Sequence, residues 1–123
     1  MSKLIIAGSR TFTDYPKFLK ALESDPQLQA VFKNLTEIVC GGAKGADALG
    51  ARYAFENKIK LKMFPADWDT HGKAAGHIRN AQMADYADSL LAFWDGQSRG
   101  TKNMMEQMFK RGKAYQVVDF NLL

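Results

Sequence analysis

The residues best able to bind a ligand are Gly-Gly-Ala-Lys-Gly-Ala-Asp at positions 41–47, which directly follow an apolar run at residues 38–40. The run predicts a short buried strand, and Gly41 and Gly42 allow the tight turn that joins such a strand to a helix. Apolar residues then recur at helical spacing over residues 43–57. Because the first N–H groups of a helix lack internal partners and carry partial positive charge, this turn favours a phosphate guest.

Two side chains on the turn bear on this interpretation. Lys44, followed by Gly45, favours an anion, although the segment has neither the Walker GK[ST] sequence nor the usual dinucleotide spacing GxGxxG. Asp47 has two interpretations: it bonds backbone N–H groups in the first helical turn, or it accepts a ribose hydroxyl. Taken alone, the motif fits tight packing as well as it fits phosphate binding.

Two other predicted strands also end in glycine loops. Residues 3–7 lead into Gly8-Ser9-Arg10, and residues 89–94 lead into the loop 95–101. Arg10 is either a solvated loop residue or a bidentate hydrogen-bond donor to a phosphate. With residues 36–40, 60–64 and 114–120, five strands alternate with helices. This pattern predicts one Rossmann-like three-layer α/β domain over residues 1–123, with a five-stranded, largely parallel sheet in an order such as 3-2-1-4-5. The three glycine loops would then converge on one crevice beyond the carboxyl ends of the strands.

Residues 66–76 predict a long functional loop. Trp68 within it either stacks on a base or covers the edge of the core, and Lys73 is a candidate ligand contact. Asp67, Asp69 and His71 are too few to predict a metal, because nothing else in the chain has ligand spacing.

Composition sets the remaining limits. The chain has no apolar run of membrane-spanning length and one cysteine, which indicates a cytoplasmic protein without a membrane partner. Its net charge of +4 favours anionic partners, and a small nucleotide accounts for it as well as a nucleic acid does.

Cys40, at the end of a predicted buried strand, is expected to be a core residue rather than a nucleophile. The last predicted helix has a core face of Thr101, Met104, Met105, Met108 and Phe109. A homo-oligomer is compatible with the sequence, which shows no unmistakable interface stripe.

A family resemblance is carried by the segments GSRTFTD, GGAKGAD, FPADW, HGKAAGHIRN, M-x-x-x-AD and SRGT, which together span nearly the whole chain. The sequence resembles the YspA-type, cpYpsA-related branch of the SLOG superfamily, Rossmann-like modules for nucleotides and for NAD-derived or ADP-ribose-like ligands. The resemblance implies a pocket lined by Gly8, Ser9, Arg10, the glycine turn with Asp47, Arg79, Asn80, Ser98, Gly100 and Thr101.

The superfamily also includes the LOG enzymes, which release a base from a nucleoside monophosphate. Their first motif is similar to Arg79-Asn80 with Met83, but their PGG-x-GT-x-x-E motif is not kept. Met104 stands where the catalytic glutamate belongs, and a thioether cannot move a proton. Glu106 lies two residues further along, on about the opposite helix face.

The leading functional hypothesis is therefore a nucleotide-binding sensor or sponge-like sequestering protein, for a phage- or defence-related signal in a bacterial or phage-infected cell. The alternatives are an enzyme acting on an N-glycosidic or phosphoribosyl bond, for which Asp47, Asp67 and Glu106 are the available acids, and single-stranded nucleic-acid binding. A bound nucleotide is the expected ligand, and no cofactor or catalytic residue is assigned.

Overall fold

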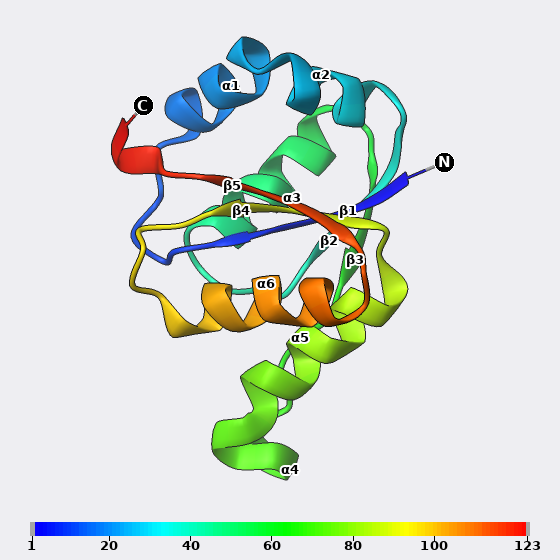
Figure 1. Ribbon diagram of the computed structural model, residues 1–123, viewed down its shortest axis with the longest axis vertical. Helices are drawn as coiled ribbons and strands as arrows, with labels where there is room; N and C mark the ends of the chain where they lie inside the picture. Colours follow the sequence, from blue (N-terminus) through cyan, green and yellow to red (C-terminus); the bar gives the residue numbers. More distant parts are fainter. Residues whose placement is uncertain (1, 123) are drawn as a thin grey trace.

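The computed structural model, which describes residues 2–122, contains a five-stranded sheet with helices on both faces (Figure 1). All four strand pairings are parallel, and the strand order is β3-β2-β1-β4-β5. The strands are β1 (Ser2–Gly8), β2 (Leu35–Cys40), β3 (Lys60–Met63), β4 (Ser89–Phe93) and β5 (Ala114–Val118). The predicted α/β Rossmann-like fold and its strand order are confirmed.

Two helical layers bury the two faces of the sheet. On one face lie α1 (Tyr15–Ser24), α2 (Pro26–Lys33) and α3 (Ala46–Glu56); on the other lie α5 (Ala75–Tyr86) and α6 (Arg99–Lys110). Alternate residues of β1 enter different cores, because side chains of a strand point to opposite faces: Ile6 packs with Phe18 of α1, and Ile5 packs with Met83 of α5. The central strands are buried on both faces, as a covered parallel sheet requires.

The prediction of a long loop over residues 66–76 is wrong. The chain instead forms α4 (Trp68–His71), the 3₁₀ turn η1 (Gly72–Ala74) and the start of α5. Asp67 explains the difference, because its carboxylate accepts the Thr70 N–H at 3.1 Å and caps α4. Figure 1 shows this segment projecting away from the sheet, below α5.

The predicted core face of the last helix is also partly wrong. Thr101 and the methionines at 104, 105 and 108 are buried, but Phe109 is 72% exposed. The helix lies against β1, β4 and β5, and the side of it that carries Phe109 faces past the edge of the sheet. Within residues 2–122, none of the helices is long and apolar enough to cross a membrane.

Candidate functional site

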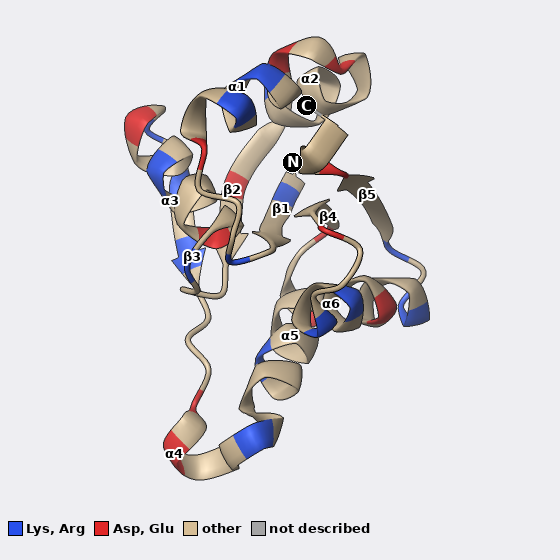
Figure 2. Ribbon diagram, turned by 90° about the vertical axis from the view of Figure 1, so that its left-hand side faces the viewer, with Lys and Arg blue, Asp and Glu red and all other residues tan. Residues whose placement is uncertain are grey.

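A cavity of about 230 Å³ opens where the carboxyl ends of β1 and β4 meet the starts of α3 and α6 and the middle of α5. Figure 2 shows lysines and arginines on several segments of this side of the molecule. Polar groups line the walls, and four apolar side chains, from two alanines and two methionines, contribute to the lining. The lining residues are Ala7, Gly8, Arg10, Ala43, Asp47, Arg79, Asn80, Met83, Ser98, Gly100, Thr101 and Met104.

Arg79 on α5 crosses to the glycine turn after β2. Its Nη1 donates to the Gly41 carbonyl at 2.5 Å, and its Nε donates to the Asn80 side chain at 3.1 Å. A Cβ atom at Gly41 would lie 2.7 Å from the guanidinium carbon of Arg79, so a side chain there would push this end of Arg79 away from the turn. Because an arginine carries five N–H donors, the guanidinium keeps donors for a ligand in the cavity.

Asp47 is the carboxyl group of the cavity, and it is 5% exposed. Its Oδ2 accepts the Gly41 N–H at 2.9 Å, which joins the first turn of α3 back to the end of β2. Burial raises the pKa of this carboxyl group, while the Gly41 N–H and the charge of Arg79 oppose the rise. Both sequence interpretations are thus compatible with its position: it bonds backbone, and it faces the cavity.

Two arginines supply positive charge to the same cavity. Burial lowers the pKa of Arg79, the carboxylate of Asp47 opposes this, and the charge of Arg10 lowers it further. Both guanidinium groups border the same cavity, so their like charges repel each other. An anion between them would relieve this repulsion and accept hydrogen bonds from both.

Asn80 connects α5 to the first turn of α6. Its amide donates to the Gly100 carbonyl and to the Asn103 side chain, both at 3.1 Å. This contact places Arg79 and Asn80 beside the N-terminus of α6, where Ser98 and Thr101 approach each other with hydroxyl oxygens 3.1 Å apart. The N-terminus of a helix is a common binding site for phosphate, because its backbone N–H groups and dipole favour an anion, and hydroxyl groups there can donate further hydrogen bonds.

The loop before α6 is held in place by hydrogen bonds to Asp95, which lies within the loop. Asp95 accepts the N–H groups of Gln97 and Ser98, both at 2.8 Å, and its own N–H donates to the Ser9 hydroxyl at 3.1 Å. These bonds to its charged form lower the pKa of Asp95. The loops after β1 and β4 are therefore tied together before any ligand arrives.

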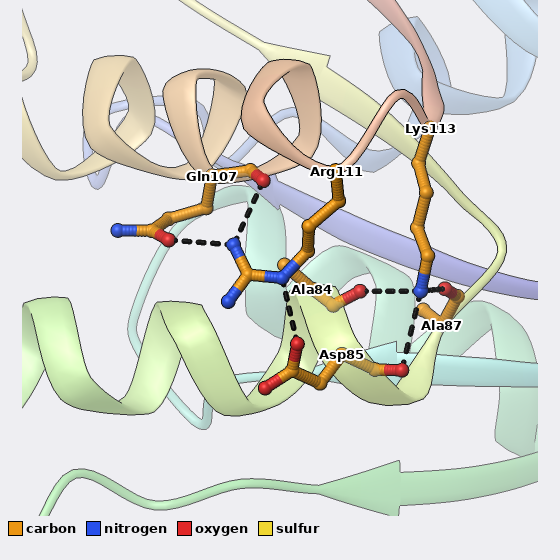
Figure 3. A network of polar contacts seen from close by, with 6 residues as sticks. All are labelled: Ala84, Asp85, Ala87, Gln107, Arg111 and Lys113. Atoms are coloured by element: carbon orange, nitrogen blue, oxygen red, sulfur yellow. Dashed lines mark hydrogen bonds and ion pairs between the residues drawn. The ribbon is translucent and has the colours of Figure 1, made fainter.

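A second contact fixes α5 against α6 at their other ends (Figure 3). Arg111 bonds Asp85 at 2.7 Å and also reaches Gln107 of α6. Lys113 donates to the carbonyls of Ala84, Asp85 and Ala87 at the end of α5, at distances of 2.7, 3.2 and 2.8 Å. Such a cation satisfies the unpaired carbonyls at a helix C-terminus and opposes its partial negative charge.

The predicted site residues divide into two groups. Eight of them line the cavity: Gly8, Arg10, Asp47, Arg79, Asn80, Ser98, Gly100 and Thr101. Seven lie outside its lining: Ser9, Gly41, Gly42, Lys44, Gly45, Trp68 and Lys73. Ser9, Gly41 and Gly45 shape the loops instead, since Ser9 is buried and its carbonyl accepts the N–H groups of Phe12 and Ala46.

Trp68 and Lys73 lie on the projecting segment, α4 and η1, and Trp68 is 55% exposed. Ala7 and Ala43 also line the cavity, which was not predicted, because small apolar residues at the ends of strands and helices carry no chemical signal. Met104 lines the cavity, and Glu106 does not, as the helical spacing of α6 predicts. Among residues 2–122, no group of three His, Cys, Asp or Glu side chains could hold a metal ion.

Cys40 is buried and unpaired with another cysteine. Burial raises the pKa of its thiol, and the nearby carboxyl group of Asp47 raises it further. A thiol in this state is not a nucleophile at neutral pH, because the reactive form is the thiolate.

The fold and the crevice together define a Rossmann-like α/β protein with its cavity at the carboxyl ends of a parallel sheet. Its sequence matches the YspA, cpYpsA-related SLOG family over residues 2–71, and the chain belongs to this family. It is 36% identical over 118 residues to the "Gene 61 protein" of Mycobacterium phage D29, covering 91% of this chain and 92% of the relative.

Among solved structures, the chain is similar to DNA processing protein A (DprA) from Streptococcus pneumoniae. The TM-score is 0.71 at 19% sequence identity, and the match covers 95% of this chain and 50% of the DprA chain. The chain therefore corresponds to half the length of that protein, and the similarity shows a shared fold.

Proposed function

We propose that the crevice binds the phosphate-bearing part of a nucleotide, as a sensor or sequestering protein of the cytoplasm. The observation that carries this proposal is the convergence of Arg10 and Arg79 with the start of α6 on one cavity. Each of these features favours an anion, and together they provide guanidinium, hydroxyl and backbone donors around one point. The family membership and the shared fold support a ligand related to nucleotides or nucleic acid.

The volume of the cavity indicates how much of the ligand it holds. At about 230 Å³ it lies below the range of about 300 to 1,000 Å³ that is typical for sites that enclose a drug-sized ligand. We therefore expect a phosphate with its ribose inside the cavity and the remainder of a larger ligand, such as an NAD derivative or ADP-ribose, outside it. Asp47 is positioned to accept a ribose hydroxyl from within the cavity.

Binding without cleavage is favoured by the acids available. Met104 lines the cavity where a LOG enzyme would have its glutamate, and Asp67 and Glu106 both lie outside the lining. Asp47 is the remaining candidate for acid or base chemistry, but the Gly41 N–H already occupies one of its oxygens. An N-glycosidic hydrolase would need Asp47 to move a proton while keeping this contact.

The proposal is tested by incubating the protein with NAD, ADP-ribose, AMP and cyclic nucleotide signals, removing unbound ligand and identifying the released ligand by mass spectrometry. Recovery of an intact nucleotide supports a sensor or sequestering protein. Recovery of fragments that accumulate at the expense of excess substrate supports the enzyme instead. Binding of oligonucleotides, with an affinity that falls steeply with salt, would support the nucleic-acid alternative.

A matched pair of variants locates the binding. Arg10 is exposed at the cavity and Lys20 is exposed on α1, so neither truncation disturbs the core. We expect Arg10→Ala to weaken nucleotide binding about tenfold or more, since a hydrogen bond to a charged group contributes about 1.5–3 kcal/mol. Lys20→Ala should leave the affinity unchanged in the same calorimetric titration. Equal affinities for both variants would contradict the proposed crevice.

A further inference from the structure

The second feature of the surface is an apolar groove between α6 and β5, with a volume of about 680 Å³. Three of its apolar side chains are unusually exposed: Phe109 by 72%, Tyr115 by 43% and Val117 by 41%. None of its residues lines the phosphate crevice. The groove is lined by Trp94, Lys102, Met105, Glu106, Phe109, Lys110, Tyr115 and Val117.

The groove arises from the position of β5 at the end of the sheet. Tyr115 and Val117 pair with Leu90 and Ala92 of β4, whose side chains are packed under α5 and α6. Side chains in register share a face, so Tyr115 and Val117 point to the same side as α6. The helix covers the buried residues of β4 but leaves the neighbouring face of β5 open.

The outer edge of β5 is also uncovered. Among residues 2–122, no strand pairs with it on the side away from β4. Soluble proteins protect such edges with charged residues or proline, because unpaired N–H and C=O groups attract another strand. The opposite edge strand, β3, follows this rule with Lys60 and Lys62, whereas β5 has the sequence Ala-Tyr-Gln-Val-Val, without a charge or a proline.

We propose that a second copy of this chain pairs its β5 with this β5, antiparallel and centred on Gln116. The strand is complementary to itself in this register. Tyr115 of each copy faces Val117 of the other on the side of the groove, an apolar pair of the kind that stabilises adjacent strands. Lys113, which precedes the strand, lies level with Asp119, which follows it, so no like charges face each other along the pair, while the Lys113 ammonium stays bonded to the end of α5.

The pairing of the two strands also accounts for the exposure of Phe109 in the single chain. A twofold axis perpendicular to the sheet keeps the α6 helices of both copies on the same face, one on each side of the joined edge. The groove of one copy then continues into the groove of the other, and Phe109 of each helix is covered between them. The proposed nucleotide-binding cavities of the two copies lie at the carboxyl ends of antiparallel strands, so they point in opposite directions and stay open.

Sedimentation velocity over a concentration series tests the assembly. The wild-type protein is expected to sediment with twice the 13.7 kDa mass of one chain. Val117→Lys adds a charge to the edge of β5 and should give the mass of one chain. Leu61→Lys is the matched control, because Leu61 is 37% exposed on the opposite edge strand, and it should remain a dimer. A monomeric wild type, or equal masses for the two variants, would overturn the proposal.

A cross-link tests the register without a charge on the edge, and so does not depend on the folding of Val117→Lys. Directly opposite residues of antiparallel strands have Cα atoms about 4.5–5.5 Å apart, within the range of about 4.4–6.8 Å that a disulfide spans. Gln116→Cys should therefore form a disulfide between copies on mild oxidation, while Leu61→Cys should not. The native Cys40 is fully buried and does not interfere. Absence of the cross-linked dimer for Gln116→Cys would contradict the register.

Discussion

The contact between the loops after β1 and β2 gives the sharpest structural prediction, at Gly45. This residue has φ 76° and ψ −130°, and the N–H of the following Ala46 donates to the Ser9 carbonyl at 3.3 Å. A Cβ at Gly45 would lie 2.6 Å from the Cα of Arg10 and closer still to the Ser9 carbonyl oxygen. Gly45→Ala must therefore separate the two loops that border the crevice.

Gly42 provides the matched control in the same turn. It has a similar φ of 78°, but a Cβ there meets only the flexible end of Met63, at 3.3 Å. Both alanine variants lose about 1–2 kcal/mol for a side chain at positive φ. Only Gly45→Ala adds the overlap with backbone atoms, about 1–3 kcal/mol for an overpacked site. We expect losses of about 2–5 kcal/mol for Gly45→Ala and about 1–2 kcal/mol for Gly42→Ala, from a total that is about 5–15 kcal/mol in such proteins.

Urea denaturation followed by circular dichroism measures the difference. The free energy of unfolding falls by about 1–3 kcal/mol per molar urea, so the midpoint of Gly45→Ala should lie about 1 M below that of Gly42→Ala. Nucleotide binding should fall with it, because Gly8 and Arg10 lie on the displaced loop. Equal midpoints for the two variants would refute the close approach of the loops as the reason for this glycine.

Two further predictions concern charged groups that contact backbone. Lys113→Met removes three contacts to the end of α5 and should lower the free energy of unfolding by about 2–3 kcal/mol. Lys20→Met, at an exposed position on α1, should change it by less than about 0.5 kcal/mol, and equal losses in urea denaturation would contradict the role of Lys113. Because burial raises the pKa of Asp47, its ionised form lowers stability above that pKa, and the loss disappears as the pH falls toward the unfolded value. Asp47→Asn keeps an oxygen for the Gly41 N–H, so it should be at least as stable as the wild type at neutral pH, with the advantage shrinking on acidification. An advantage of the wild type that grows with pH would show that pairing with Arg79 outweighs burial.

The sheet could be predicted from sequence because its signals are local. The central strands β1, β2 and β4 are short apolar runs that each end in a glycine loop, so the order of strands and the shared edge of the loops followed from the alternation with helices. The glycine loops pointed to part of the polar lining, such as Arg10 and Asp47, whereas Arg79, Asn80 and Ser98 entered through the family resemblance.

The errors concern features that depend on tertiary contacts. Trp68 was expected in a long loop, but capping by Asp67 turns the segment into a helix that projects from the body. Phe109 has the helical spacing of a core residue, yet its burial depends on where α6 lies over the sheet, which spacing does not encode. The bond from Arg79 to the carbonyl of Gly41 joins residues 38 positions apart, and no local pattern predicts it.

The central claim is that a nucleotide phosphate is held by donors around the crevice, and amide NMR of the labelled protein tests it most directly. Titration with the nucleotide recovered from the ligand panel should shift the N–H resonances of Gly8, Gly100 and Thr101, which line the cavity. Gly112, at the far end of α6, should not shift. Saturable shifts confined to the first group would support the account. Shifts confined to α4 around Trp68, or to β5, would place the ligand elsewhere and contradict it.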